Sequence, residues 1–259
     1  MNKRFSLLAN LLPKNDPRYK KWRKSLNKRP ATWSKGYTKE THPSIARMVR
    51  TFKKKKIDNF SEWRKEMKKL GKIKSNYLSF ERNGDLAELI GAILGDGNIF
   101  KFPRTEALTI ASNAKNVGFV RRYSLLVEKV FSKKPTLNKP YDGCVKIRLY
   151  EKNISQRLNI PMGSRKNRKI GVPSWISKNR EYLIRYLRGL YEAEGSFCVH
   201  RPTYTYKFLF SNKNESLLNN VYRSLKKLGF HPHASKYQIQ VSRKEEVYGV
   251  KDLIKFRQY

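Results

Sequence analysis

Two stretches of the sequence decide the fold: LIGAILGDGNI at Leu89–Ile99 and LRGLYEAEGSF at Leu187–Phe197, which align at a shift of 98 residues. The aligned pairs are Gly91 with Gly189, Gly95 with Ala193, Asp96 with Glu194, and Gly97 with Gly195. An internal repeat of this kind predicts a body made of two similar halves.

Each stretch reads as a helix with small residues four positions apart, which places them on one face. Glycine costs about 1 kcal/mol relative to alanine inside a helix, so close packing has to compensate for it. We therefore expect the two helices to pack against each other through these faces. Glycine just past a helix end favours a left-handed cap, so Asp96 and Glu194 are expected to be the last helical residues and to lie side by side.

The residues after each stretch follow the same order. The first half has an extended pattern, a helical pattern and another extended pattern at 106–113, 119–131 and 145–150; the second half has them at 204–212, 215–228 and 237–243. A basic connector, 165–180, joins the halves. The duplication predicts one pseudo-symmetric α+β body.

Two carboxylates at the negative ends of two helices repel each other and resist ionisation unless a cation is present. Mg²⁺ takes carboxylate and carbonyl oxygens, and such ions activate water in phosphodiester cleavage. A single Asp-Gly at a helix end is common turn chemistry, whereas two copies on matching helices are far more specific. The pair predicts a site for Mg²⁺ or another divalent cation such as Mn²⁺.

The composition indicates a polyanionic partner. The 259 residues include 58 Lys and Arg against 20 Asp and Glu, a net charge of +38. Charge alone does not distinguish DNA, RNA and an anionic membrane surface. No apolar run approaches the roughly 20 residues that span a bilayer, and no signal peptide is evident, so a soluble, intracellular protein is expected. Two cysteines and four histidines show neither disulfide nor zinc-site spacing.

Residues 1–80 form a separate basic segment, with 24 basic and 5 acidic residues. It contains the run Lys53, Lys54, Lys55 and Lys56 and the interspersed aromatic residues Tyr19, Trp22, Trp33 and Trp63. One helix is expected from an N-cap at Asn59 or Ser61 to a C-cap at Gly71. We interpret 1–80 as a mostly helical DNA-binding extension; the alternative is a solvated tail, although such tails are poor in aromatic residues.

From Asp85 to Tyr259 the paired motifs resemble those of the LAGLIDADG homing endonucleases of the single-chain, two-motif type. The resemblance implies two αββαββα repeats, here 81–180 with the connector and 181–259, whose saddle-shaped antiparallel sheets lie on the major groove of double-stranded DNA. It also implies a monomer, since one chain carries both motifs.

The resemblance implies roles for particular residues. Asp96 and Glu194 would bind the metal, helped by the carbonyls of Gly95 and Ala193. The candidates for ordering water or assisting catalysis are Asn113, Asn212, Lys213 and Lys166, with Lys169 as a further basic candidate. Ala114 stands where the second half has Lys213, so a lysine role is asymmetric.

Alternation along the extended segments predicts which side chains face DNA. The outward residues are Lys146, Arg148 and Tyr150 in the first half and Gln238, Gln240 and Ser242 in the second. Arg and Lys pair with guanine and Gln with adenine, although any half-exposed sheet also has a polar face. The sequence thus predicts a homing endonuclease that cleaves both DNA strands at a long site. An intron RNA maturase and a noncatalytic DNA-binding regulator remain alternatives.

Overall fold

The computed structural model describes residues 13, 15–27, 34–55, 58, 60–72, 76–138 and 140–259. The chain forms two compact units, Met1–Asn76 and Tyr77–Tyr259. The second unit begins before residue 80 because the preceding residues pack onto it. The Arg157 guanidinium lies 3.8 Å from the centre of the Phe80 ring, and its Nε donates to the carbonyl of Leu78 at 2.7 Å.

The described part of the N-terminal unit is helical. It contains α2 (Pro17–Asn27), α3 (Pro43–Lys54) and α4 (Ser61–Lys69). Helix α4 differs from the expectation at its start, because Ser61 is its first helical residue and Phe60 occupies the N-cap without a side-chain hydrogen bond. Lys53, Lys54 and Lys55 are exposed. Trp33, Lys56 and Asn59 lie outside the described residues.

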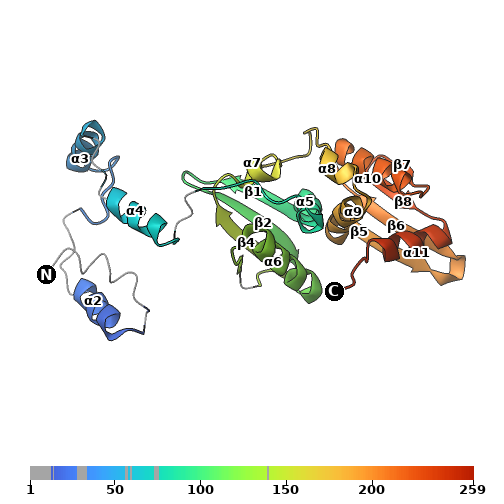
Figure 1. Ribbon diagram of the computed structural model, residues 1–259, viewed down its shortest axis with the longest axis horizontal. Coiled ribbons are helices and arrows are strands. Elements are labelled where there is room, and N and C mark those ends of the chain that lie inside the picture. Colours follow the sequence, from blue (N-terminus) through green and yellow to red (C-terminus); the bar gives the residue numbers. More distant parts are fainter. Residues whose placement is uncertain are drawn as a thin grey trace. The chain divides into compact units, whose positions relative to one another are not determined.

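The second unit contains the duplicated body (Figure 1). The first repeat runs α5 (Gly84–Asp96), β1 (Gly97–Lys101), β2 (Glu106–Asn113), α6 (Val117–Phe131), β3 (Thr136–Leu137), β4 (Cys144–Glu151) and α7 (Ile154–Leu158). After α8 (Ser174–Ser177), the second runs α9 (Arg180–Glu194), β5 (Gly195–His200), η1 (Arg201–Thr203), β6 (Thr205–Ser211), α10 (Glu215–Lys227), β7 (His233–Ser235), β8 (Gln238–Val241) and α11 (Lys244–Leu253). The sheets are antiparallel, in the orders β1-β2-β4-β3 and β5-β6-β8-β7. The predicted α+β fold with two αββαββα repeats is confirmed.

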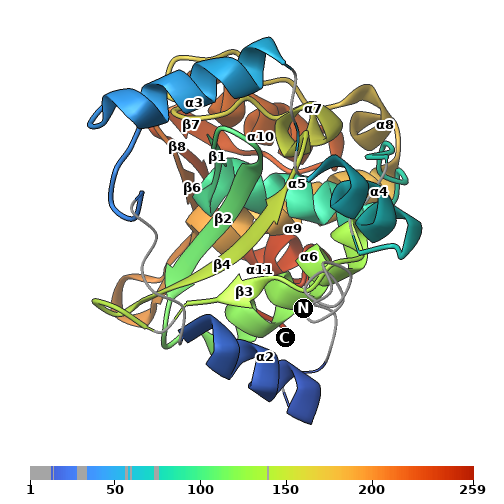
Figure 2. The ribbon, with the colours of Figure 1, turned by 90° about the vertical axis from the view of Figure 1, so that its left-hand side faces the viewer.

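Helices α5 and α9 lie side by side between the two sheets, as the views in Figures 1 and 2 agree. Their glycine faces meet as predicted. A Cβ atom placed on Gly91 would overlap the carbonyl oxygen of Tyr186, and one on Gly189 would overlap that of Glu88 and lie 2.6 Å from the nitrogen of Ala92. The two backbones are therefore in contact, and only glycine permits the approach.

A buried ionic cluster reinforces this helix pair. Glu88 on α5 is fully buried, and it accepts two hydrogen bonds from Arg122 of α6, at 2.6 and 2.8 Å. From α9, Arg185 Nε lies 2.6 Å and Arg188 Nε lies 3.7 Å from the Glu88 carboxylate. A buried charge is tolerated only when it is paired, so this carboxylate ties both repeats together.

The inner faces of both sheets complete the hydrophobic core. Val145, Ile147 and Leu149 on β4 are buried, as are Ile239 and Val241 on β8. The predicted alternation of inward and outward residues is confirmed for both strands. Among the described residues, no helix has the length and apolar character that crossing a bilayer requires.

Candidate active site

The two acids end the two packed helices. Asp96 is the last residue of α5 and Glu194 the last of α9, as predicted. The predicted left-handed caps are wrong, because Gly97 has φ −87° and ψ 156° and Gly195 has φ −88° and ψ 150°, both extended. Each chain passes directly from helix into strand. Glycine is required there for space, since a Cβ on Gly97 would lie 2.5 Å from the Cα of Ile93.

The last turns of α5 and α9 touch. A Cβ on Gly95 would lie 2.5 Å from the Cβ of Ala193 and 3.3 Å from the Cγ of Glu194. The last carbonyls of a helix lack intrahelical partners and carry its negative dipole end, so two such ends converge here. The residues predicted to bind metal thus share one location.

Electrostatics at this location disfavour two ionised carboxylates. The pKa of Asp96 is raised to about 7, first by burial of the carboxyl group and then by the charge of Glu194. Asp96 is nonetheless exposed at the protein surface, so water reaches its carboxyl group. Burial also raises the pKa of Glu194, against the hydrogen bond from Asn212, whose Nδ2 donates to Glu194 Oε1 at 3.3 Å.

This donor set fits a hard divalent cation. Two carboxylates whose ionisation is opposed, together with last-turn carbonyls, offer the oxygen ligands that Mg²⁺ and Mn²⁺ accept. Within the described part of the chain, no group of three or more His, Cys, Asp or Glu side chains converges. Carbonyl groups, side-chain amides, water or a bound phosphate would supply any ligands beyond the acid pair.

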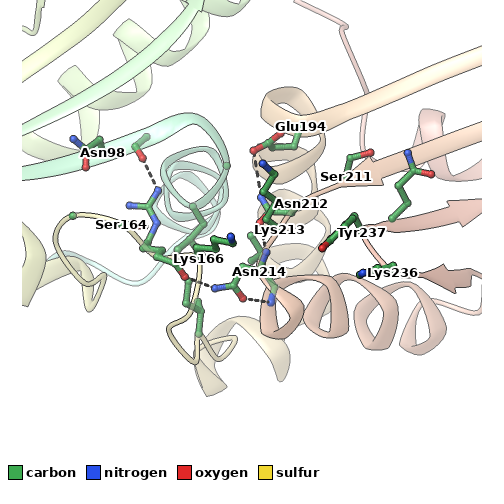
Figure 3. Close-up of a pocket in the computed structure, with 18 of the residues that line it drawn as sticks. Asn98, Ser164, Lys166, Glu194, Ser211, Asn212, Lys213, Asn214, Lys236 and Tyr237 are labelled. Carbon is green, nitrogen blue, oxygen red and sulfur yellow. Dashed lines mark hydrogen bonds between the residues drawn. The ribbon is translucent and has the colours of Figure 1, made fainter.

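A pocket of about 1010 Å³ opens beside the acids (Figure 3). Six of the predicted site residues line it: Gly95, Lys166, Glu194, Asn212, Lys213 and Gln238. Asp96 borders it through its neighbours Gly95 and Gly97 without lining it. Other residues of the wall, which the sequence analysis did not single out, include Asn98, Arg165, Asn214, Lys236 and Tyr237.

Asn113 and Lys169 do not join this group. Asn113 is exposed, and its Oδ1 accepts the backbone N–H of Lys115 at 2.9 Å. Lys169 lines a different pocket, of about 550 Å³, beside α7. Asn212 accepts the backbone N–H of Asn214 in the same way, at 2.9 Å, but its Nδ2 also donates to Glu194, so the two repeats differ at the acids.

Arg165 was missed in the sequence and covers the end of α5. Its Nη2 donates to the carbonyls of Ile93 at 2.9 Å and Gly97 at 2.5 Å. Burial lowers the pKa of this arginine from its usual value. A guanidinium against the negative end of a helix offsets part of the negative potential there.

The buried Asn214 holds the connector that carries Arg165. Its Oδ1 accepts the backbone N–H of Leu217 at 2.9 Å and caps α10, while its Nδ2 donates to the carbonyls of Arg165 at 2.5 Å and Arg168 at 2.9 Å. The helix cap was readable from Asn before Glu215. The link to the connector depends on the tertiary fold and left no local signal.

The outward strand residues form a polar face on each sheet. Lys146 and Tyr150 are exposed and Arg148 is half-buried on β4, opposite Thr109 of β2. On the second sheet Gln238 is exposed, and Gln240 Nε2 donates to the hydroxyl of Ser242 at 2.5 Å. Base reading by these residues stays a prediction.

Comparisons with known proteins agree with the predicted family. The family model of the LAGLIDADG-like domain matches residues 181–259, which cover the second repeat. Similar solved structures include mesophilic variants of the homing endonuclease I-DmoI, at 19% identity over 66% of this chain and 94% of that chain with a TM-score of 0.48. Another is I-DmoI in complex with DNA and Mn, at 18% identity, 66% and 96% coverage and a TM-score of 0.47.

The N-terminal LAGLIDADG domain of DUF199/WhiA is also similar, at 17% identity over 69% of this chain and 86% of that chain with a TM-score of 0.47. The search of curated proteins found no match.

Proposed function

We propose that this chain is a site-specific, divalent-metal-dependent endonuclease, because residues 181–259 match the model of a LAGLIDADG-like domain and the first repeat has the same architecture. It cleaves both strands of double-stranded DNA at a long recognition site and acts as a monomer in intron homing. One observation carries the proposal. Two helices in backbone contact present Asp96 and Glu194 together, with the pKa of Asp96 raised to about 7 by burial and by its partner's charge.

Asp96 and Glu194 would hold the cation, with the carbonyls of Gly95 and Ala193 as further donors. When bound, Mg²⁺ supplies activation of water and stabilisation of the leaving oxygen. The Asn212 amide holds the Glu194 carboxylate in place through their hydrogen bond. Lys166 and Lys213, which both line the pocket, offer positive charge to the scissile phosphates.

The sheets supply the recognition surface in this proposal. Arg148 and Lys146 favour guanine contacts and the glutamines of β8 favour adenine, so the two halves read different sequences. The exposed lysines of α3 extend the phosphate contacts beyond the duplicated body. We assign the N-terminal unit this role.

A noncatalytic DNA-binding regulator would gain nothing from two opposed carboxylates, which weaken binding to a polyanion. That argues for catalysis. An intron RNA maturase would have the same high positive charge as an endonuclease. The two differ in a competition binding assay, in which a maturase should prefer RNA to duplex DNA.

The decisive test is cleavage of a supercoiled plasmid that carries the uninterrupted insertion locus, with Mg²⁺ or with EDTA. Wild type should linearise the plasmid only with Mg²⁺, and Asp96→Asn and Glu194→Gln should lose at least about 100-fold in rate. Asp252→Asn, an exposed carboxylate on α11, is the matched control and should cut normally. Inactivity of all four proteins together with tight duplex binding would favour the regulator.

A further inference from the structure

The outward face of the first sheet carries an aromatic cluster that the proposed catalysis does not use. Phe100 on β1, Phe102 just beyond it and Tyr150 on β4 are 55%, 39% and 40% exposed. The ring centres of Phe100 and Phe102 are 4.9 Å apart, and those of Phe102 and Tyr150 are 5.9 Å apart. The rings support one another, which limits their conformational freedom.

The strand register shows that this aromatic cluster lies on the proposed recognition face. Phe100 pairs with Ala107, and Ala107 pairs with Tyr150, so the three form one row across β1, β2 and β4. Ala107 is only 4% exposed although it stands apart from the main hydrophobic core, as expected if the rings cover it. The adjacent outward row is Asn98, Thr109 and Arg148, so the cluster continues the polar surface.

Positive charge surrounds the rings. Lys101, Arg104, Lys133 and Lys152 are exposed near the same strand ends, and Lys133 Nζ donates to the carbonyl of Tyr150 at 2.6 Å. An apolar surface surrounded by Lys and Arg side chains is complementary to a polyanion that also exposes apolar groups. In the major groove, the apolar group on the base edges is the C5-methyl of thymine.

The second repeat presents different chemistry at the same place. The equivalent row pairs the exposed Cys198 of β5 with Lys207 of β6. Neither residue is aromatic. The aromatic row of the first sheet therefore has no aromatic counterpart in this row of the second sheet.

We infer that the aromatic cluster of Phe100, Phe102 and Tyr150 reads thymine C5-methyl groups in the DNA half-site bound by the first sheet. This inference rests on the proposed function, since it requires DNA on that face. Removing a buried methyl costs about 0.8 kcal/mol, so each contacted thymine should contribute about fourfold to affinity.

The test compares two duplexes of identical sequence, containing the uninterrupted insertion locus and made with either thymine or deoxyuridine. Binding is measured without divalent cations, using the full-length chain. Wild type should bind the thymine duplex about 4- to 16-fold more tightly. Phe100→Ala should bind both duplexes alike, at the wild-type affinity for the deoxyuridine duplex, whereas Phe100→Leu should keep part of the preference.

Cys198→Ala, in the equivalent row of the second sheet, is the control and should behave as wild type. Equal binding of both duplexes by wild type, or an undiminished preference in Phe100→Ala, would overturn the inference and leave the proposed endonuclease intact. Failure of wild type to bind either duplex would instead count against the proposed function. Circular dichroism of each variant separates loss of folding from loss of recognition.

Discussion

Substitution of Gly189 by alanine should separate the two acids without touching either of them. The added Cβ would lie 2.6 Å from the nitrogen of Ala92, against 3.4 Å for an ordinary contact, and would overlap the carbonyl of Glu88. Both obstacles are backbone atoms, which no rotamer change can remove. Helices α5 and α9 must therefore move apart by about 0.8 Å or more at this point.

The expected change in stability is the difference between an overpacking cost and a gain in helix propensity, and the expected change in rate follows from the displacement of the acids. Overpacking costs about 1–3 kcal/mol, and alanine in place of glycine returns about 1 kcal/mol of helix propensity. The net loss of about 0–2 kcal/mol lowers the Tm by up to about 8 °C in a unit of this size. A displacement near 1 Å at a catalytic site costs about 100-fold in rate, so activity should fall far more than stability.

The assay is single-turnover cleavage with Mg²⁺, run beside thermal unfolding of the same preparations. Gly171→Ala is the matched control, because no atom lies within 4 Å of a Cβ at that position and its φ is not left-handed. That variant should retain both rate and Tm. Full activity of Gly189→Ala would refute the idea that backbone contact sets the position of the acids.

Other perturbations have equally definite outcomes. In EDTA, Asp96→Asn should be more stable than wild type at pH 8 and equal to it below pH 4. The pKa of Asp96 is about 7 in the folded protein, so the stability of wild type falls as the pH rises from the ordinary aspartate pKa toward 7. Urea titrations at both pH values measure this difference. Glu88→Gln should lose about 3–5 kcal/mol of unfolding free energy because Arg122 and Arg188 lose the carboxylate that pairs with them, and an unchanged urea midpoint would contradict this. Asn212→Ala should slow cleavage of one DNA strand more than the other, since Asn113 has no matching contact, and the measurement is the accumulation of nicked plasmid. Deleting residues 1–76 should flatten the dependence of log Kd on log salt, whereas an unchanged slope would remove the N-terminal unit from phosphate binding.

Much of the duplicated body was predictable because its signals are local or repeated. The glycine spacing located the helix interface, and the residue before each Gly identified the acids. Strand alternation identified Lys146 and Gln238 as outward residues. The spacing of apolar residues along a helix or strand reflects which side of that element faces the core, so the inward and outward sides can be predicted from the sequence.

Features that depend on contacts between distant segments could not be predicted. The extended conformation of Gly97 follows from the direct entry of α5 into β1, where the sequence resembles an ordinary helix cap. Asn113 and Asn212 occupy matching places, yet only Asn212 reaches an acid. The sequence does not distinguish Arg165 from the other residues of the basic connector, because its position depends on the hydrogen bond from Asn214 that holds the connector against α10.

The ionic cluster around Glu88 makes the two halves unlike partners. Two copies of the second repeat, placed about the same axis, would bring Arg185 and Arg188 of one copy against the same arginines of the other, without Asp85 and Glu88, the acids of the first repeat that now pair with them. Electrostatics thereby disfavours self-association of that half and favours its union with the first. A chain cut within the connector should therefore reassemble as a mixed pair of first and second repeats, so that either repeat could be replaced without the other.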